Sequence, residues 1–208
     1  MTQKGAHAMR ELKLHKRAGL AAMAAIALAL PGCVSLGEDP PATLFNLTPS
    51  AMAPAGLSAT GTVEQALAVI EPDAPQRLDV ARVPVQVDES TVAYLQDAMW
   101  VEKPARLFGR LLAETIRAGQ SRMVIEGADI GYAAATKLSG QLVDMGYDAT
   151  LGAVVVRFDA VLQQPGGTIL TRRFEAEVDG VPAEARYVAP ALNEAANDVA
   201  AQVAEWVG

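Results

Sequence analysis

Two pairs of acidic residues are the places where this sequence could carry out acid–base chemistry. Glu71 and Asp73 are separated by one proline, and Asp144 and Asp148 lie four residues apart. Facing carboxylates can act as general acid and general base, and clustered ones can hold a cation. Nothing places a second carboxylate opposite Glu71 and Asp73, and Asp144 and Asp148 lack EF-hand spacing. We predict turns at both pairs; the alternatives are a carboxylate-only hydrolase at the first and a weak cation site at the second.

Other residue types that commonly carry catalysis are scarce after the first 32 residues. Lys103 and Lys137 are the only lysines there, and no nucleophile motif surrounds either one. Four glycines lack the spacing of a dinucleotide-binding or phosphate-binding loop. They are Gly127, Gly131, Gly166 and Gly167.

Residues 1–32 have the composition of a secretory signal peptide. Five basic residues precede the apolar run Ala18–Leu30, and Cys33, the single cysteine, follows a glycine. A 13-residue helix spans about 20 Å, short of the roughly 30 Å hydrocarbon core, so we expect no transmembrane anchor here. The ending Leu30, Gly32, Cys33 resembles a bacterial lipobox, in which the cysteine is lipidated and becomes the mature N-terminus. The alternative is an ordinary buried cysteine.

Cleavage before Cys33 would leave a mature chain without histidine, because His7 and His15 both precede that residue. The only thiol would carry the lipid. Histidine and cysteine are the usual metal ligands and partners in nucleophilic catalysis. We therefore predict no enzyme activity, no catalytic residue, no metal site, no internal disulfide and no cofactor other than the covalent lipid (palmitate among its chains) on Cys33.

The mature chain is strongly acidic. Removing the leader leaves 12 basic against 23 acidic residues, a net charge of −11. This charge disfavours nucleic acid as a partner and disfavours electrostatic adhesion to anionic lipid. Membrane attachment then depends on the lipid anchor, and several acyl chains hold firmly where one holds only marginally.

Composition divides the chain into a leader (residues 1–32), a lipidated tether (33–42) and one domain (43–208). Within the domain, residues 49–61 have low sequence complexity and are expected to form a mobile loop. No repeat or long linker divides the chain after residue 62. At 51% apolar residues the chain can supply a single core.

Periodicity predicts an α+β domain, with a mostly antiparallel sheet packed against two main helices, about 104–119 and 190–207. Apolar residues at a 3.6-residue period mark each helix, and alternating residues mark the strands. A proline at position 84 places the predicted hairpin at an edge of the sheet. The strands are expected at 43–48, 63–70, 82–88, 90–95, 123–125, 138–147, 153–163 and 168–178.

Aromatic and sulfur-containing side chains gather just before the first predicted helix. Tyr94, Met99 and Trp100 could form an exposed patch that docks a partner, since such residues dominate protein interfaces. The alternative is that Trp100 covers the core.

The order of these residues resembles the ABC-type transport auxiliary lipoprotein family, the lipoproteins encoded with Mce-type (Mla- and Pqi-like) lipid transport systems. The resemblance extends from about residue 43 to 207 and is most specific between residues 78 and 112. It depends on the lipobox, Phe45 and Leu47, Val69–Pro72, Leu78–Arg82, Tyr94, Trp100, Pro104 and Leu107–Leu112.

The resemblance implies a non-enzymatic subunit anchored to a membrane and facing the periplasm. Its expected partners are an Mce-domain protein, which carries phospholipid or a related hydrophobic substrate, and the permease and ATPase of that system. A homo-oligomer is a further possibility. Val34 lacks the aspartate that retains many lipoproteins at the inner membrane, so the outer membrane is favoured. The alternative is an outer-membrane lipoprotein that scaffolds envelope assembly without a role in transport.

Overall fold

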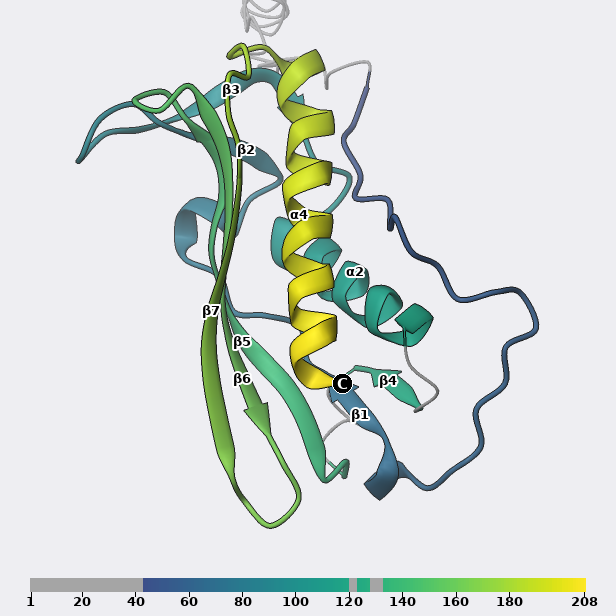
Figure 1. Cartoon of the computed structure of the whole chain (residues 1–208). Helices are drawn as coiled ribbons and strands as arrows, with labels where there is room; N and C mark the ends of the chain where they lie inside the picture. Colours follow the sequence, from purple (N-terminus) through teal and green to yellow (C-terminus); the bar gives the residue numbers. More distant parts are fainter. Residues whose placement is uncertain (1–42, 120–122, 128–132) are drawn as a thin grey trace, which may run out of the picture. The chain divides into compact units, whose positions relative to one another are not determined.

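The computed structural model describes residues 43–119, 123–127 and 133–208, all within the second of two units, residues 1–40 and 41–208. The signal peptide, Cys33 and the tether therefore lie outside the described residues. Within the described part the chain forms seven strands, two α-helices and two short 3₁₀ helices (Figure 1). Their bounds are η1 Val63–Gln65, β1 Leu67–Val69, η2 Gln76–Leu78, β2 Arg82–Gln86, β3 Val92–Met99, α2 Pro104–Gly119, β4 Val124–Glu126, β5 Thr136–Asp148, β6 Ala153–Gln163, β7 Ile169–Val178 and α4 Ala185–Val207.

Strand β5 organises the sheet. Along one side it pairs antiparallel with β6, which pairs antiparallel with β7. Along its other side it pairs with two strands in parallel, β1 near Thr136–Leu138 and β2 at Tyr147–Asp148. β4 continues the sheet beyond β1 in parallel, and β3 continues it beyond β2 as a hairpin. The predicted α+β class and mostly antiparallel sheet are confirmed, and the hairpin lies at an edge as its proline indicated.

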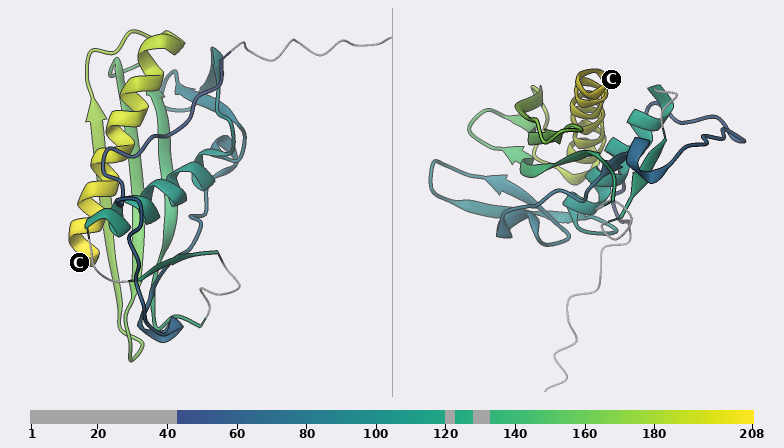
Figure 2. Two further views of the ribbon diagram at one scale, coloured as in Figure 1. Left: turned by 90° about the vertical axis from the view of Figure 1, so that its right-hand side faces the viewer. Right: turned by 90° about the horizontal axis from the view of Figure 1, so that it is seen from below.

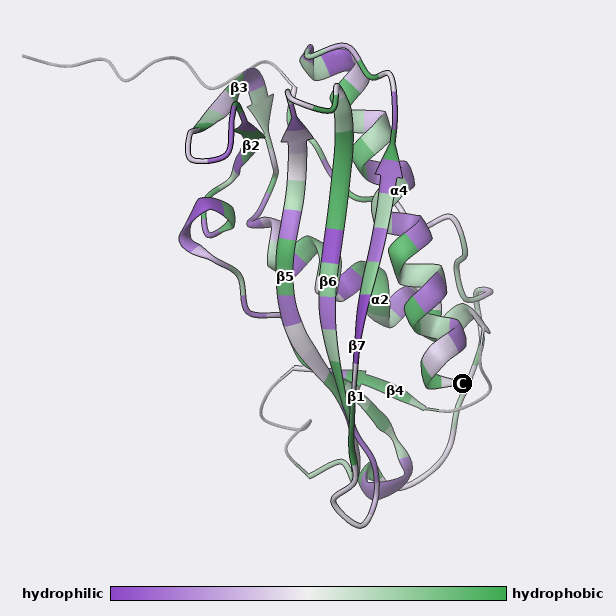
Figure 3. Cartoon of the chain, turned by 60° about the vertical axis from the view of Figure 1, so that its left-hand side comes forward, coloured by the Kyte–Doolittle hydropathy of each residue, from purple (hydrophilic) through white to green (hydrophobic). Residues whose placement is uncertain are grey.

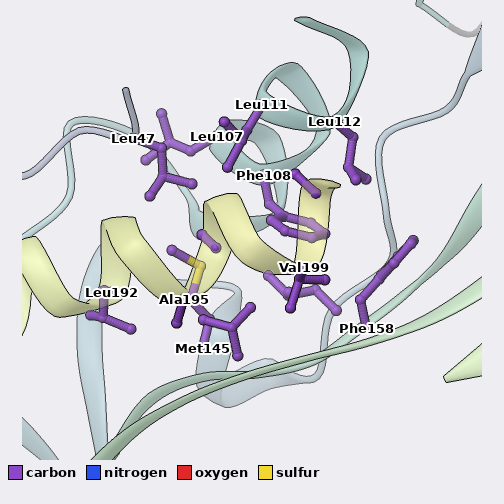
Figure 4. Close-up of a cluster of buried hydrophobic side chains, with 14 of the residues drawn as sticks. Leu47, Leu107, Phe108, Leu111, Leu112, Met145, Phe158, Leu192, Ala195 and Val199 are labelled. Atoms are coloured by element: carbon purple, nitrogen blue, oxygen red, sulfur yellow. The ribbon is translucent and has the colours of Figure 1, made fainter. Parts of the chain in front are cut away.

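Both α-helices cover the same face of this sheet (Figure 3). The buried face of α2 carries Phe108, whose ring packs edge-on against Phe158 of β6 at 5.3 Å between centroids. Leu111 of α2 and Val199 of α4 lie in the same cluster (Figure 4). Burying side chains of this size contributes about 1.5–3 kcal/mol each, so this layer supplies much of the stability.

Helix α4 begins at Ala185, five residues before the start predicted from Pro190. Val188 in the added turn is fully buried, and its amide and that of Tyr187 both donate to the carbonyl oxygen of Glu184. Pro190 thus lies inside the helix, past the first turn, where it cannot donate a hydrogen bond to the carbonyl group four residues earlier. The start of this helix therefore depends on burial of its first turn, which the spacing of apolar residues in the sequence does not indicate.

Gly140 shows how closely β5 and β6 approach. Its φ of +151° is a conformation that side chains disfavour, and a Cβ built there would lie 2.1 Å from the carbonyl oxygen of Asp159. The ring of Phe158 would lie 2.9 Å from that Cβ. Only glycine fits, because the aromatic ring occupies the space that a side chain would need.

The opposite face of the sheet is polar in the part that β6 and β7 form (Figure 3). Asp159 of β6 pairs with Arg173 of β7, with two nitrogen–oxygen contacts of 2.6 Å. Arg157 forms an ion pair with Glu175, two residues further along the ladder. Alternation of buried and charged residues along these strands therefore reflects one packed face and one exposed face.

Candidate functional site

The segment that precedes β1 is an extended strap, residues 45–53, which begins against the end of β3. The amide of Phe45 donates to the carbonyl oxygen of Met99 (2.7 Å), and the amide of Val101 donates to the carbonyl oxygen of Phe45 (2.9 Å). The Phe45 ring packs edge-on against Trp100 at 5.7 Å between centroids. The strap thus adds a single parallel bridge to the outer edge of β3.

The strap then crosses the two helices (Figure 2). Asn197 of α4 accepts a hydrogen bond from the amide of Ser50 (2.7 Å) and donates to the carbonyl oxygen of Thr48 (3.0 Å). Asn193, one turn earlier, accepts from the amide of Thr48 at 2.7 Å. Residues 49–53 are irregular, as the predicted loop requires, and Asn197 of α4 binds the backbone of this segment at Ser50.

On α2 the strap is held by Glu114, whose carboxylate accepts a hydrogen bond from the amide of Ala53 at 2.9 Å. That amide, aided by Arg117, holds the pKa of Glu114 below its usual range, although desolvation opposes the shift. One feature of the sequence indicates the two asparagines that hold the strap on α4. Asn193 and Asn197 lie four residues apart on a helix that is otherwise packed with alanine, leucine and valine.

Between the strap and α2 lies a groove of about 290 Å³. Its floor is apolar, and its rim carries Arg110, Arg117 and two carboxylates. Each rim charge has an ion-pair partner: Arg117 contacts both Glu114 and Glu126, and Arg110 contacts Glu102. The groove can hold an apolar or amphipathic group, and it offers no unpaired nucleophile. Its lining residues are Asn46, Leu47, Pro49, Leu107, Arg110, Leu111, Glu114, Arg117 and Glu126.

The structure brings together two of the three residues predicted to dock a partner. In the β2–β3 hairpin, Arg82 lies opposite Met99, and Pro84 lies opposite Tyr94. Tyr94 and Met99 therefore share a face although they are five residues apart. The guanidinium of Arg82 lies 4.5 Å from the centroid of the Tyr94 ring, an arrangement that favours a cation–π contact.

The shared face of Tyr94 and Met99 depends on a bulge in β3. Residues 95–98 oppose the single residue Val83, and Asp97 within this bulge has a left-handed φ of +53°. Asparagine and aspartate tolerate this conformation better than most residues. The bulge changes which residues of β3 face the same side of the sheet after it. The alternation of residue types in the sequence does not indicate this change.

Trp100 does not belong to this surface. Its side chain is 2% exposed and lies in the core, covered by Phe45 of the strap, so it cannot contact a partner. The alternative interpretation, in which Trp100 covers the core, agrees with its burial. Its indole nitrogen has no hydrogen-bond partner among the described residues.

Glu71 and Asp73 do not face each other as an acid–base pair. The Glu71 carboxylate lies 3.4 Å from Arg106 of α2 and is more than half exposed. The backbone of Asp73 bridges to β5, where its amide donates to Gly140 and its carbonyl oxygen accepts from Leu142. The predicted turn is therefore wrong at this pair: both residues lie in an extended connection after β1, in which Asp73 forms a parallel bridge with Gln141 of β5.

The predicted turn is found at Asp148 but not at Asp144, which lies inside β5. Asp144 pairs with Arg77 at 3.2 Å, and burial raises the pKa of its carboxyl even though Arg77 and Arg157 oppose the shift. Asp148 accepts hydrogen bonds from the amide and hydroxyl of Thr150 and from the amide of Leu151, which closes the β5–β6 turn. Those bonds lower the pKa of Asp148.

The remaining candidates add no reactive cluster within the described ranges. Lys103 forms an ion pair with Asp79 at 2.7 Å. No group of three or more histidine, cysteine or acidic residues suited to a metal ion occurs in residues 43–119, 123–127 and 133–208. Among the helices that the structure describes, none is both long and apolar enough to cross a membrane.

Comparison with known proteins identifies the family. The family model for the ABC-type transport auxiliary lipoprotein component matches residues 45–204, from the strap to the last turn of α4. The chain belongs to this family. The match begins at Phe45, so the strap and both helices are parts of the auxiliary lipoprotein domain. No curated protein matches the chain.

Two of the solved structures that align with this auxiliary lipoprotein share its fold at low sequence identity. A Xanthomonas campestris protein assigned to the family model DUF330 aligns with a TM-score of 0.65 and 16% identity over 79% of this chain and 94% of its own. An uncharacterized protein aligns with a TM-score of 0.60 and 14% identity over 80% of this chain and 100% of its own. PelC from Paraburkholderia phytofirmans, solved as a dodecamer, aligns at 0.40 with 16% identity over 70% and 89% of the two chains.

Proposed function

We propose that this protein is a lipid-anchored auxiliary subunit of an Mce-type ABC transport system, which moves phospholipid or a related hydrophobic substrate across the envelope. The observation that carries the proposal is the family match over residues 45–204. The auxiliary subunit would associate with the Mce-domain protein, while the permease and ATPase carry substrate and hydrolyse nucleotide.

We propose a binding role rather than a catalytic one for the domain. The carboxylates predicted as candidates are engaged in structure: Glu71 with Arg106, Asp144 with Arg77, and Asp148 within a turn. The groove under the strap likewise presents charges that are already paired. These contacts support a surface that binds, with the covalent lipid on Cys33 as its only attached group.

We propose that Cys33 is the anchor and that the domain faces the periplasm at the outer membrane, as Val34 favours. Thr43 lies ten positions after Cys33, so a fully extended tether would span at most about 35 Å. Cys33→Ser should abolish incorporation of labelled palmitate, leave the leader uncleaved, and remove the protein from the outer-membrane fraction. Unchanged fractionation would show that Cys33 is not the anchor.

We propose that the partner contacts the exposed side of the β2–β3 hairpin around Arg82, Tyr94 and Met99. Arginine, tyrosine and methionine are enriched at protein interfaces, and here the first two stack on each other. Because the strap bridges to the end of β3 at Phe45, this surface is continuous with the strap.

A pull-down with the tagged full-length chain from detergent-solubilised membranes tests the assignment. We expect an Mce-domain protein among the recovered partners, and a loss of at least about tenfold in its recovery for the double variant Arg82→Glu/Tyr94→Ala. Arg106→Glu, a change of the same charge on the exposed side of α2, should leave recovery unchanged. Recovery of unrelated envelope proteins alone would favour the scaffolding alternative and reject the transport role.

A further inference from the structure

Strand β7 ends the sheet with an edge that is open along its length. Among the described strands it pairs with β6 alone, over all ten of its residues. At its outer side the side chain of Gln202 donates one hydrogen bond to the carbonyl oxygen of Glu175, at 3.3 Å. Strands of this length with an unpaired edge are templates for another strand unless charges, prolines or bulges prevent pairing. β7 contains no proline, and its pairing with β6 has no register shift.

The charges along β7 change sign at its centre. Arg172 and Arg173 precede Phe174, and Glu175 and Glu177 follow it. A strand of this kind is complementary to a second copy of itself running in the opposite direction. Like charges would face each other if the same two strands paired in parallel.

We propose that two copies of this chain associate through β7, paired antiparallel about a two-fold axis at Phe174. In this register Arg173 lies opposite Glu175 of the second copy, and Thr171 lies opposite Glu177. The single long bond from Gln202 would be replaced by a ladder of backbone hydrogen bonds. The two seven-stranded sheets would become one continuous sheet.

Charge order across the combined sheet supports this register. On the polar face, Arg157 of β6 already pairs with Glu175, and Asp159 pairs with Arg173. Adding the second copy extends each pair into a row of four alternating charges: Arg157, Glu175, then Arg173 and Asp159 of the other copy. Opposite charges on neighbouring strands stabilise a sheet, and here each row continues across the axis.

The covered face also fits. Helix α4 packs over both β6 and β7, so two copies of α4 would lie about two strand spacings apart, roughly 10 Å, which is the distance at which helices pack. An acidic groove of about 480 Å³ lies between α4 and β7, lined in part by Ala176, Asp198 and Glu205. Arg172 of the second copy lies opposite Ala176, so its guanidinium would enter this groove and offset the carboxylates there.

Cysteine cross-linking of the full-length protein in its membranes tests the register. Residues directly opposite in an antiparallel pair have Cα atoms about 5.5 Å apart, within the range of a disulfide. We expect Thr171→Cys/Glu177→Cys to form a covalent dimer under mild oxidation. Either single variant should remain monomeric on a non-reducing gel, because the two copies of one position would lie about 20 Å apart.

Three outcomes would overturn the proposal. They are a folded double variant that forms no dimer, dimers of equal yield from the single variants, and cross-links to another protein in place of a second copy. The wild-type chain, whose single cysteine is Cys33, is the background control.

Charge exchange keeps the proposal testable without cysteines. Arg173→Glu and Glu175→Arg should each weaken self-association by about tenfold or more in sedimentation equilibrium of the detergent-solubilised chain, because like charges then face each other twice. Mixing the two variants should restore association, since opposite charges then face each other again at both positions across the axis. Arg106→Glu is the matched control, because Arg106 is 58% exposed and Arg173 is 61% exposed. Failure of the mixture to associate while both variants remain folded would reject the pairing.

Discussion

The two outer strands β3 and β7 end the sheet in different ways. β3 is interrupted by the bulge at residues 95–98, and the backbone of Phe45 pairs with its last residues. β7 is regular over ten residues, and one side-chain bond from Gln202 reaches its outer side. The strap covers the core behind β3, whereas α4 covers the core behind β7.

This difference shows two solutions to one problem. An unpaired edge invites uncontrolled pairing, and proteins limit it with bulges, charges or a covering segment. At β3 the chain covers its own edge with the strap and a bulge. At β7 it presents charges in an order that is complementary to a second copy of the strand running in the opposite direction. The covered edge at β3 should therefore stabilise the single chain, and the open edge at β7 should promote association of two copies.

The largest effect should come from the tryptophans that mark the two edges. Trp100→Ala should lower the free energy of unfolding by about 3–5 kcal/mol, because it leaves a cavity beneath Phe45. Trp206→Ala should cost less, since Trp206 is only partly buried where it packs against Phe174. Urea unfolding followed by far-ultraviolet circular dichroism measures both. Equal losses would show that the strap does not tighten the core at β3.

A smaller loss should follow from Gly146→Ala, which tests how the β2–β3 hairpin joins β5. A Cβ at this position would lie 2.5 Å from the carbonyl oxygen of Pro84, so the hairpin must move away. We expect a loss of about 2–3 kcal/mol in the free energy of unfolding. Gly119→Ala is the control, because no atom lies within 4 Å of a Cβ built there, and its stability should change by less than about 1 kcal/mol. Equal effects would mean that the contact is not tight.

The sequence predicted the open half of this comparison better than the covered half. Strands β5, β6 and β7 were evident from alternation, and α2 from its apolar stripe, because each pattern repeats within one element. The exposed charges of β7 could also be placed on one face by counting residues in twos. Burial patterns of this kind are local, so the sequence carries them directly.

The covered half depends on contacts between residues far apart in the chain. Asn197 binds the backbone of Thr48 across 149 positions, and Phe45 covers Trp100. The bulge that contains Asp97 brings Tyr94 and Met99 to the same face of the hairpin. No repeating pattern in the sequence indicates this bulge. For these reasons Trp100 could be predicted either as an exposed residue or as a core residue, and only packing decides between the two.

Releasing the strap should cost less than emptying the core. Asn197→Ala removes the acceptor for the amide of Ser50 and the donor to Thr48, and we expect a loss of about 1–3 kcal/mol. Hydrogen exchange at Ser50 should accelerate, while exchange in β7 should not change. Asn193→Ala is the milder comparison, because it removes one bond, to the amide of Thr48. Unchanged exchange at Ser50 would show that Asn197 does not hold the strap.

The smallest effect should be a difference in the sign of the pH dependence between two carboxylates. Near β2, burial raises the pKa of Asp144 despite its contact with Arg77. Its contribution is therefore fully present below the unfolded-state pKa of about 3.9 and is lost as pH rises through the folded pKa. On β6, the hydrogen bond from Arg173 lowers the pKa of Asp159, and that contribution is present above about pH 3.9 and lost as pH falls through the folded pKa.

Urea unfolding of Asp144→Asn and Asp159→Asn between about pH 3 and 8 separates these signs. Relative to the wild type, Asp144→Asn should become more favourable as pH rises through this window. Asp159→Asn should become less favourable over the same rise, by no more than about 1 kcal/mol, because its ion pair with Arg173 is exposed. Parallel pH profiles would show that the carboxylate beneath Arg77 is as well solvated as the one on the open face. The distinction between a covered and an open side of the sheet would then not extend to its charges.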